Sequence, residues 1–149
     1  MSIKEKIRSD LKDAMKARET EKRDVLRMLD SSIKNAEIEK GKREEGLNDE
    51  EVIELVSRAI KQRKESSEQY KKGGREDLAE KEGSEIEFLS EYLPEQLSED
   101  ELRKIISDVI SEVGATSKAD MGKVMGATMG RVKGQADGNL VKKLLEEIL

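Results

Sequence analysis

Few residues of this 149-residue chain could carry catalytic chemistry, because it contains no cysteine and no histidine. Their absence excludes disulfides, thiolate catalysis, zinc sites of the usual ligands and histidine acid–base chemistry. Ser66 and Ser67, after Lys64, have the residue types of an amidase nucleophile and its base. They lack the glycine- and serine-rich setting that forms an oxyanion hole. We therefore expect no catalytic residue, no metal and no cofactor.

The most unusual pattern of the sequence is a glycine and methionine repeat in the last third of the chain. Glycines recur there every four residues, and methionines precede three of them: Gly122, Gly126, Gly130 and Gly134, with Met121, Met125 and Met129. Each glycine inside a helix costs about 1 kcal/mol relative to alanine, so three before Gly134 ends the helix cost roughly 3 kcal/mol. On a helical wheel they form a bare strip along an apolar stripe. The strip serves either close packing of a neighbouring helix or contact with a phosphate backbone.

Charge supports a local and not a general attraction to nucleic acid. The chain carries 29 Lys or Arg against 34 Asp or Glu, for a net charge of -5. Residues 114–149 are the one positive segment, with six cations and four carboxylates. Any binding to nucleic acid must therefore be local and salt-sensitive. No aromatic residue follows Tyr92, so recognition of RNA shape is favoured over base stacking.

The periodicity of the chain predicts helices throughout. Apolar residues recur at helical spacing over residues 3–18, 20–41, 48–70 and from Gly74 to Leu93. Asn48 with Glu51 resembles a capping box. In the second helix we expect seven buried residues: Val25, Leu26, Met28, Leu29, Ile33, Ala36 and Ile38. With 34% hydrophobic residues and only three aromatic ones, the core must be aliphatic and thin.

Pro94, the only proline, marks the most probable boundary. Beyond it, Ser98 with Glu101 resembles a second capping box, and Gly114 closes that helix. Ser117 or Thr116 is expected to cap the glycine-striped helix, and Asp137 the last one. We therefore predict an all-α fold with a helical N-terminal subdomain, residues 1–93, followed by a small three-helix bundle, residues 95–149.

Several motifs resemble a known family. Residues 120–126 and 133–138, with Val141, resemble the domain that ends the B subunit of the glutamyl/aspartyl-tRNA amidotransferases. Residues 26–29, 33–38 and 92–97 (Tyr-Leu-Pro-Glu-Gln-Leu) resemble the free-standing bacterial YqeY-like proteins, so the resemblance runs essentially end to end. The matching positions are Gly122, Lys123, Gly126, Lys133, Gly134 and Asp137. Gly138 departs from the amidotransferase pattern, which more often has asparagine and proline in this turn.

This resemblance implies two helical subdomains and a C-terminal domain that in the amidotransferase holds tRNA. It does not imply catalysis, because the amidotransferase's synthetase-like core and its amidase partner have no counterpart here. The leading hypothesis is a non-catalytic protein that binds tRNA, or a tRNA-modifying or aminoacylating enzyme, through its last three helices. The alternative is a protein–protein adaptor that docks a partner helix on the methionine and glycine face. No membrane or DNA partner is expected.

The expected nucleic-acid-binding residues are the glycines of the strip and the cations near it: Lys118, Gly122, Lys123, Gly126, Gly130, Arg131, Lys133, Gly134 and Lys142. Their alternative role is a solvated basic face. A second basic run over residues 58–75 is explained first by the helix dipole, since it lies near a helix C-terminus. The N-terminus lacks the apolar core of a signal peptide, so we expect a cytoplasmic protein.

Overall fold

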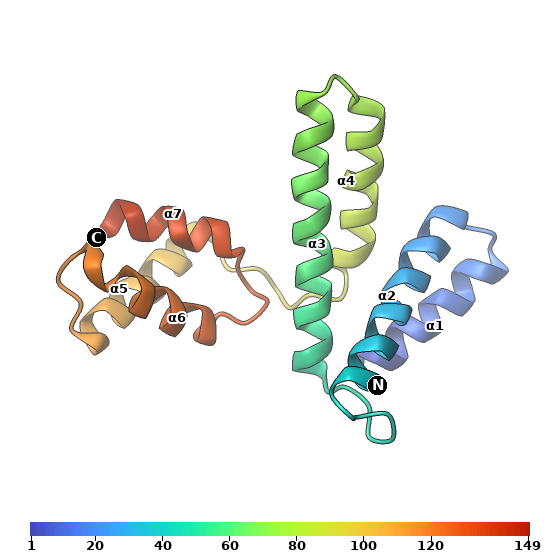
Figure 1. The fold of residues 1–149 in the computed structure, drawn as a ribbon, viewed down its shortest axis with the longest axis horizontal. Coiled ribbons are helices and arrows are strands. Elements are labelled where there is room, and N and C mark those ends of the chain that lie inside the picture. The colour runs from blue at the N-terminus through green and yellow to red at the C-terminus, as the bar shows by residue number, and fades with distance from the viewer. The chain divides into compact units, whose positions relative to one another are not determined.

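The fold is all-α, as predicted. A computed structural model describes residues 1–149 and contains seven α-helices, one short 3-10 helix and no strand (Figure 1). The chain divides into two compact units, Met1–Leu93 and Pro94–Leu149. Each unit has its own hydrophobic core.

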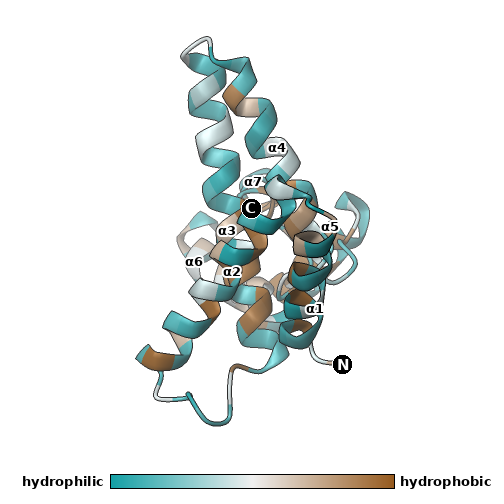
Figure 2. Ribbon diagram, turned by 90° about the vertical axis from the view of Figure 1, so that its right-hand side faces the viewer, coloured by the Kyte–Doolittle hydropathy of each residue, from teal (hydrophilic) through white to brown (hydrophobic).

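The first unit consists of two helical hairpins. Helix α1 (Ile3–Lys16) pairs with α2 (Thr20–Glu39), and α3 (Asp49–Lys72) pairs with α4 (Glu76–Ser90), as Figure 1 shows. Their shared core is aliphatic apart from one tyrosine: Ile7, Val25, Leu26, Leu29, Ile33, Leu47, Val52, Val56, Ile60, Leu89 and Tyr92. None of these core residues lies between Ile60 and Leu89. The far end of the α3–α4 hairpin is accordingly mostly hydrophilic (Figure 2).

Helix ends follow the local signals of the sequence. At the start of α3, Asn48 accepts a hydrogen bond from the Glu51 backbone N–H at 2.9 Å, and the Glu51 side chain accepts one from Asn48 at 3.1 Å. The predicted capping box is therefore present. Hydrogen bonds from Lys42, from the Asn48 backbone and from Lys40 lower the pKa of Glu51 to about 2. At α2, by contrast, Thr20 is the first helical residue and the cap position is Glu19, which makes no side-chain bond.

The predicted burial of two α2 residues is wrong. Met28 is 61% exposed and Ile38 is 52% exposed, although both fit a helical spacing with apolar neighbours. The core covers the side of α2 that carries Leu29 and Ile33, and Met28 and Ile38 lie outside that side. Glu37 is buried instead, because Lys4 bonds its carboxylate at 2.5 Å and the Leu47 backbone N–H donates to it at 3.0 Å.

The end of the first unit is fixed by Tyr92. Its ring is buried, and its hydroxyl donates to Asp10 of α1 at 2.6 Å. Burial, the bond to Asp10 and its charge raise the Tyr92 pKa, so the hydroxyl keeps its proton. This contact anchors the residue two positions before Pro94.

The second unit is a small three-helix bundle of α5 (Glu99–Val113), α6 (Met121–Arg131) and α7 (Gly138–Ile148), with the 3-10 helix η1 (Lys118–Asp120) running into α6. Its core contains eight fully buried aliphatic residues: Leu102, Ile106, Val109, Val124, Val132, Val141, Leu144 and Leu145. Gly114 closes α5 with φ 69°, a left-handed conformation that suits glycine. Asp137 caps α7, as predicted, by accepting from the Asn139 N–H at 2.9 Å.

Two other predicted caps differ in detail. Ser98 accepts from the Glu101 N–H at 3.2 Å, but its hydroxyl also donates to the Glu101 carboxylate. The reciprocal bond of a capping box, which the Ser98 N–H would donate to the Glu101 carboxylate, is therefore absent. Ser117 caps η1 and not α6 directly, since it accepts from Ala119.

The segment after Pro94 is tied to the loop between α6 and α7. The Gln96 side chain donates to the Gly134 carbonyl at 2.7 Å, and the Leu97 N–H donates to the Gln135 carbonyl at 2.9 Å. Gly134 has φ 72°, so its carbonyl is presented from a left-handed turn. The Tyr-Leu-Pro-Glu-Gln-Leu motif and the motif at residues 133–138, far apart in sequence, thus support each other.

Candidate nucleic-acid interface

Helix α6 and its cap residue Val132 consist of three repeats of four residues, Met-Gly-Lys-Val, Met-Gly-Ala-Thr and Met-Gly-Arg-Val, over residues 121–132. Residues four apart share one face of a helix, so the repeat produces four parallel rows. We name them the core row, the methionine row, the glycine row and the cation row. The core row consists of Val124, Thr128 and Val132, all 0% exposed.

The glycine row, Gly122, Gly126 and Gly130, lies on the solvent side of α6. A Cβ atom built on any of the three meets no atom within 4 Å. The row is therefore not a packing seam against another helix of the second unit, which was one of the two interpretations of the pattern. Within this unit nothing offsets the helix propensity that the three glycines forgo, up to about 3 kcal/mol.

Helix α6 ends earlier than predicted. Its last helical residue is Arg131, and Val132 is the cap position, so Gly134 lies in the following turn. Gly134 consequently contributes a backbone carbonyl held by Gln96 and not a fourth member of the glycine row.

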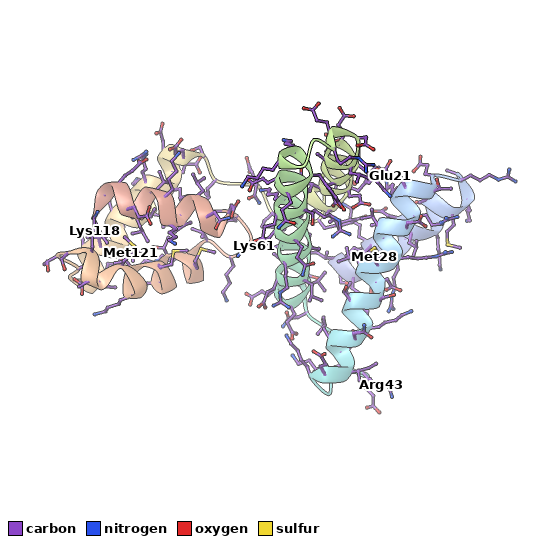
Figure 3. The ribbon with its side chains drawn as sticks, turned by 45° about the horizontal axis from the view of Figure 1, so that its top comes forward. Glu21, Met28, Arg43, Lys61, Lys118 and Met121 are labelled. Carbon is purple, nitrogen blue, oxygen red and sulfur yellow. The ribbon has the colours of Figure 1, made fainter.

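The methionine row flanks the glycine row on one side. Met121, Met125 and Met129 are half-buried and pack against the core of the second unit; Met121 is labelled in Figure 3. The Cε atoms of Met125 and Met129 lie 3.9 Å from the position of a Cβ on Gly138. A side chain at position 138 would thus meet only ordinary contacts, and the departure of Gly138 from the amidotransferase pattern leaves the Asp137 cap intact.

The cation row, Lys123, Ala127 and Arg131, flanks the glycine row on the other side. Lys123 is exposed, whereas the Arg131 guanidinium bonds the carboxylate of Glu112 on α5. This ion pair, nineteen residues apart in sequence, could not be read from the pattern. Of the two charged members of the row, only Lys123 projects without a carboxylate partner.

The other predicted cations are dispersed around α6. Lys118 lies in η1, before the first turn of α6, and is exposed (Figure 3). Lys133 is exposed in the turn after α6, and Lys142 lies on the exposed side of α7. The second unit as a whole carries eight cations and ten carboxylates. Positive potential is therefore confined to the surroundings of α6 and α7 and does not extend over the unit.

The basic run on α3 is largely engaged within the first unit. Arg63 donates to Glu85 of α4 at 3.1 Å and to the Ala59 carbonyl at 3.1 Å. Arg75 bonds Asp77, also at 3.1 Å. Lys71 and Lys72 occupy the last turn of α3, where the helix dipole favours cations. Structural roles thus account for much of this run.

The sides of α2 and α4 that face each other are acidic. Five of the eight residues that line an open groove there bear carboxylates; Glu21 among them is labelled in Figure 3. The lining consists of Thr20, Glu21, Asp24, Asp77, Glu80, Lys81, Ser84 and Glu85. Such a lining disfavours a polyanion. No group of three or more carboxylates is arranged to hold a metal ion.

Ser67 is one of the two serines that have the residue type of an amidase nucleophile. Its hydroxyl donates to the Ala79 carbonyl at 3.4 Å.

Fold and site together define an all-α protein of two helical units, with its candidate site on the open surface of one short helix. The model of the family described as "Yqey-like protein" matches residues 4–149, so the chain belongs to this YqeY-like family. The resemblance to the YqeY-like proteins is thereby confirmed.

Three curated relatives to which the chain is similar are fungal proteins. The chain is 42% identical over 88 residues to "Altered inheritance of mitochondria protein 41, mitochondrial" of Lachancea thermotolerans, a match that covers 58% of this chain and 46% of that protein. The protein of the same name from Kluyveromyces lactis is 36% identical over 86 residues, or 58% and 45% of the two chains. An uncharacterised protein of Schizosaccharomyces pombe is 36% identical over 88 residues, 59% of this chain and 69% of that one.

These matches correct two expectations. The prediction of a cytoplasmic protein is wrong against relatives that are named mitochondrial, and that of a bacterial protein is wrong against relatives that are eukaryotic. The first rested on the lack of an N-terminal apolar segment, and the second on the resemblance to free-standing bacterial proteins. The chain spans about half the length of the first two relatives. No helix of the structure has both the length and the apolar character needed to cross a membrane.

Proposed function

We propose that this protein is a non-catalytic RNA-binding protein, with tRNA as the candidate ligand, and that its second unit binds the RNA backbone along the glycine and cation rows of α6. The observation that carries the proposal is the open glycine row beside Lys123, with nothing within 4 Å of any added Cβ. A row of glycines that no other residue of the second unit covers is kept despite its cost in helix stability. A ligand that needs close approach to the α6 backbone accounts for it.

In this proposal the glycines leave room for the ligand and donate no hydrogen bonds to it. Backbone N–H groups in the middle of a helix already bond the carbonyls four residues before them. The row therefore lets a sugar–phosphate chain approach the helix axis, while Lys123 and Lys118 supply point charges to phosphates. Since this unit has no aromatic residue, it has no side chain on which a base could stack. It would therefore recognise the shape of the RNA backbone.

The resemblance of residues 120–126 and 133–138 to the amidotransferase domain that holds tRNA supports the same conclusion by analogy. Gln96 belongs to this proposal as a positioning residue, since it holds the Gly134 carbonyl in the turn that carries Lys133.

A second candidate function is docking of a partner helix, such as one from a tRNA-modifying or aminoacylating enzyme. The specific observation in its favour is the four-residue repeat itself. A helix that lacks one row of side chains presents a groove for the ridge of another helix, and the half-buried methionine row would form its apolar wall.

Binding of total tRNA by the full-length protein, titrated against salt, tests the proposal. Lys123→Gln should weaken binding and make the salt slope shallower by about 1, the change expected when one phosphate contact is lost. Lys104→Gln is the matched control, since it removes the same charge from the exposed side of α5. Absence of binding to the wild type, or equal losses in both variants, would refute the assignment; a partner protein lost with Met125→Gln but kept with Lys123→Gln would favour the second candidate.

A further inference from the structure

The ion pair between Arg131 and Glu112 joins the cation row to α5. The Arg131 guanidinium donates to a Glu112 carboxylate oxygen, and the two side chains are 44% and 56% exposed. A carboxylate and a phosphate present similar planar or forked acceptors to a guanidinium. Glu112 therefore occupies on Arg131 the place that an RNA phosphate would take.

Glu112 is poorly placed for the stability of its own helix. It lies one residue before the end of α5, and the last turn of α5 carries no basic residue. A carboxylate near a helix C-terminus opposes the helix dipole. The exposed ion pair itself stabilises the fold little, because solvent screens both groups. The position of Glu112 is thus explained better by its pairing with Arg131 than by a contribution to the stability of the fold.

We propose that Glu112 is an intramolecular competitor for the RNA site, so that Arg131 joins the site only when a phosphate displaces the Glu112 carboxylate. This inference rests on the proposed function and concerns the regulation of that same surface. Lys123 and Arg131 are eight residues apart on α6, which places them about 12 Å apart along the helix axis. A backbone segment that runs along the row reaches both cations, whereas an isolated phosphate reaches one.

The consequence is a preference for extended, continuous RNA backbone over small anions. Binding at Lys123 positions the next phosphates beside Arg131, and the exchange of one anion for another on Arg131 then completes the site. In the free protein Arg131 is neutralised by Glu112 and attracts no small anion.

A double-mutant cycle on the full-length protein tests this inference, with total tRNA as the probe. Glu112→Gln should tighten binding at low salt and make the affinity ratio between 50 and 200 mM salt about 3.5-fold larger, the effect of one added phosphate contact. Arg131→Gln should weaken binding in both backgrounds, but more strongly in the Glu112→Gln background, where it should abolish the gain. Asp108→Asn, which removes the same charge one turn earlier on α5 and does not pair with Arg131, should give a smaller gain that is independent of Arg131.

The outcomes separate the two proposals. Wild-type binding with the same Arg131→Gln effect in both backgrounds overturns the competitor role and leaves the proposed function standing. Equal gains from Glu112→Gln and Asp108→Asn also overturn it, because they reduce the effect to net charge. Failure of both the wild type and Glu112→Gln to bind tRNA overturns the proposed function itself and this inference with it.

Discussion

Replacing the three glycines of the glycine row by alanine should separate stability from binding. Each of Gly122, Gly126 and Gly130 lies inside α6, and a Cβ on each meets no atom within 4 Å. The substitution therefore adds helix propensity without a clash, about 1 kcal/mol at each position and up to about 3 kcal/mol in the triple variant. The same three methyl groups stand between the helix backbone and any closely approaching ligand. The triple variant should thus be more stable and bind RNA more weakly.

The assay is amide hydrogen exchange of α5, α6 and α7 in the full-length protein, with tRNA titrations on the same samples. Exchange reports the free energy of opening of this unit separately from the first one. For a domain of this size about 1 kcal/mol corresponds to a shift of about 4–8 °C in melting temperature, so the gain is also visible in a thermal scan. Ala127→Gly in the neighbouring row is the matched control, and it should destabilise α6 while leaving the glycine row open.

Two results would refute the reasoning. A stabilised triple variant with unchanged tRNA affinity would show that close approach to the glycine row is not needed. A destabilised triple variant would show that the row is covered by a contact within the protein. Only stabilisation together with weaker binding agrees with a ligand-approach surface.

Three further predictions concern stability and pH. Thr128→Val should raise the free energy of unfolding by about 1 kcal/mol, measured by urea denaturation, because the Thr128 hydroxyl is buried without a hydrogen-bond partner. Arg18→Gly should stabilise the α1–α2 turn by up to about 1 kcal/mol in the same assay, since Arg18 has φ 58° at the position where helices favour glycine; a neutral or destabilising effect would contradict a strained turn. The folded-state pKa of Glu51, about 2, lies below its ordinary value of 4.5, so its contribution is complete above pH 4.5 and is lost as the pH falls toward 2. Glu51→Gln should flatten the dependence of stability on pH in that window, and an unchanged dependence below pH 4.5 would contradict the stabilisation of the ionised Glu51 carboxylate by Lys42 and Lys40.

The sequence predicted most helix ends because their signals are local. The Asn48 cap, the left-handed Gly114 and the Asp137 cap each depend on residues within one turn. The errors arose where tertiary neighbours decide the outcome. Met28 and Ile38 have the right type and spacing for burial, but the core of the first unit covers a different side of α2.

The sequence indicated which residues form the candidate site, but not the contacts that arrange them. The four-residue repeat identified the glycine strip, and the structure places it on an open surface. Two determinants of the site could not be predicted, because each joins residues that are distant in sequence: the pairing of Arg131 with Glu112 and the bond from Gln96 to Gly134. The burial of Glu37 beside Lys4 in the first unit could not be predicted for the same reason. Contacts of this kind leave no periodic signal in the chain.

The most direct test of the central claim is to map tRNA onto the full-length protein by NMR. Backbone amide shifts recorded during a titration resolve the glycines individually, so the glycine row can be followed without any substitution. We predict that the largest changes fall on Gly122, Gly126, Gly130 and Lys123, and that they diminish as salt is raised. Changes confined to α1–α4, or no specific changes at low salt, would contradict an RNA-binding surface on α6.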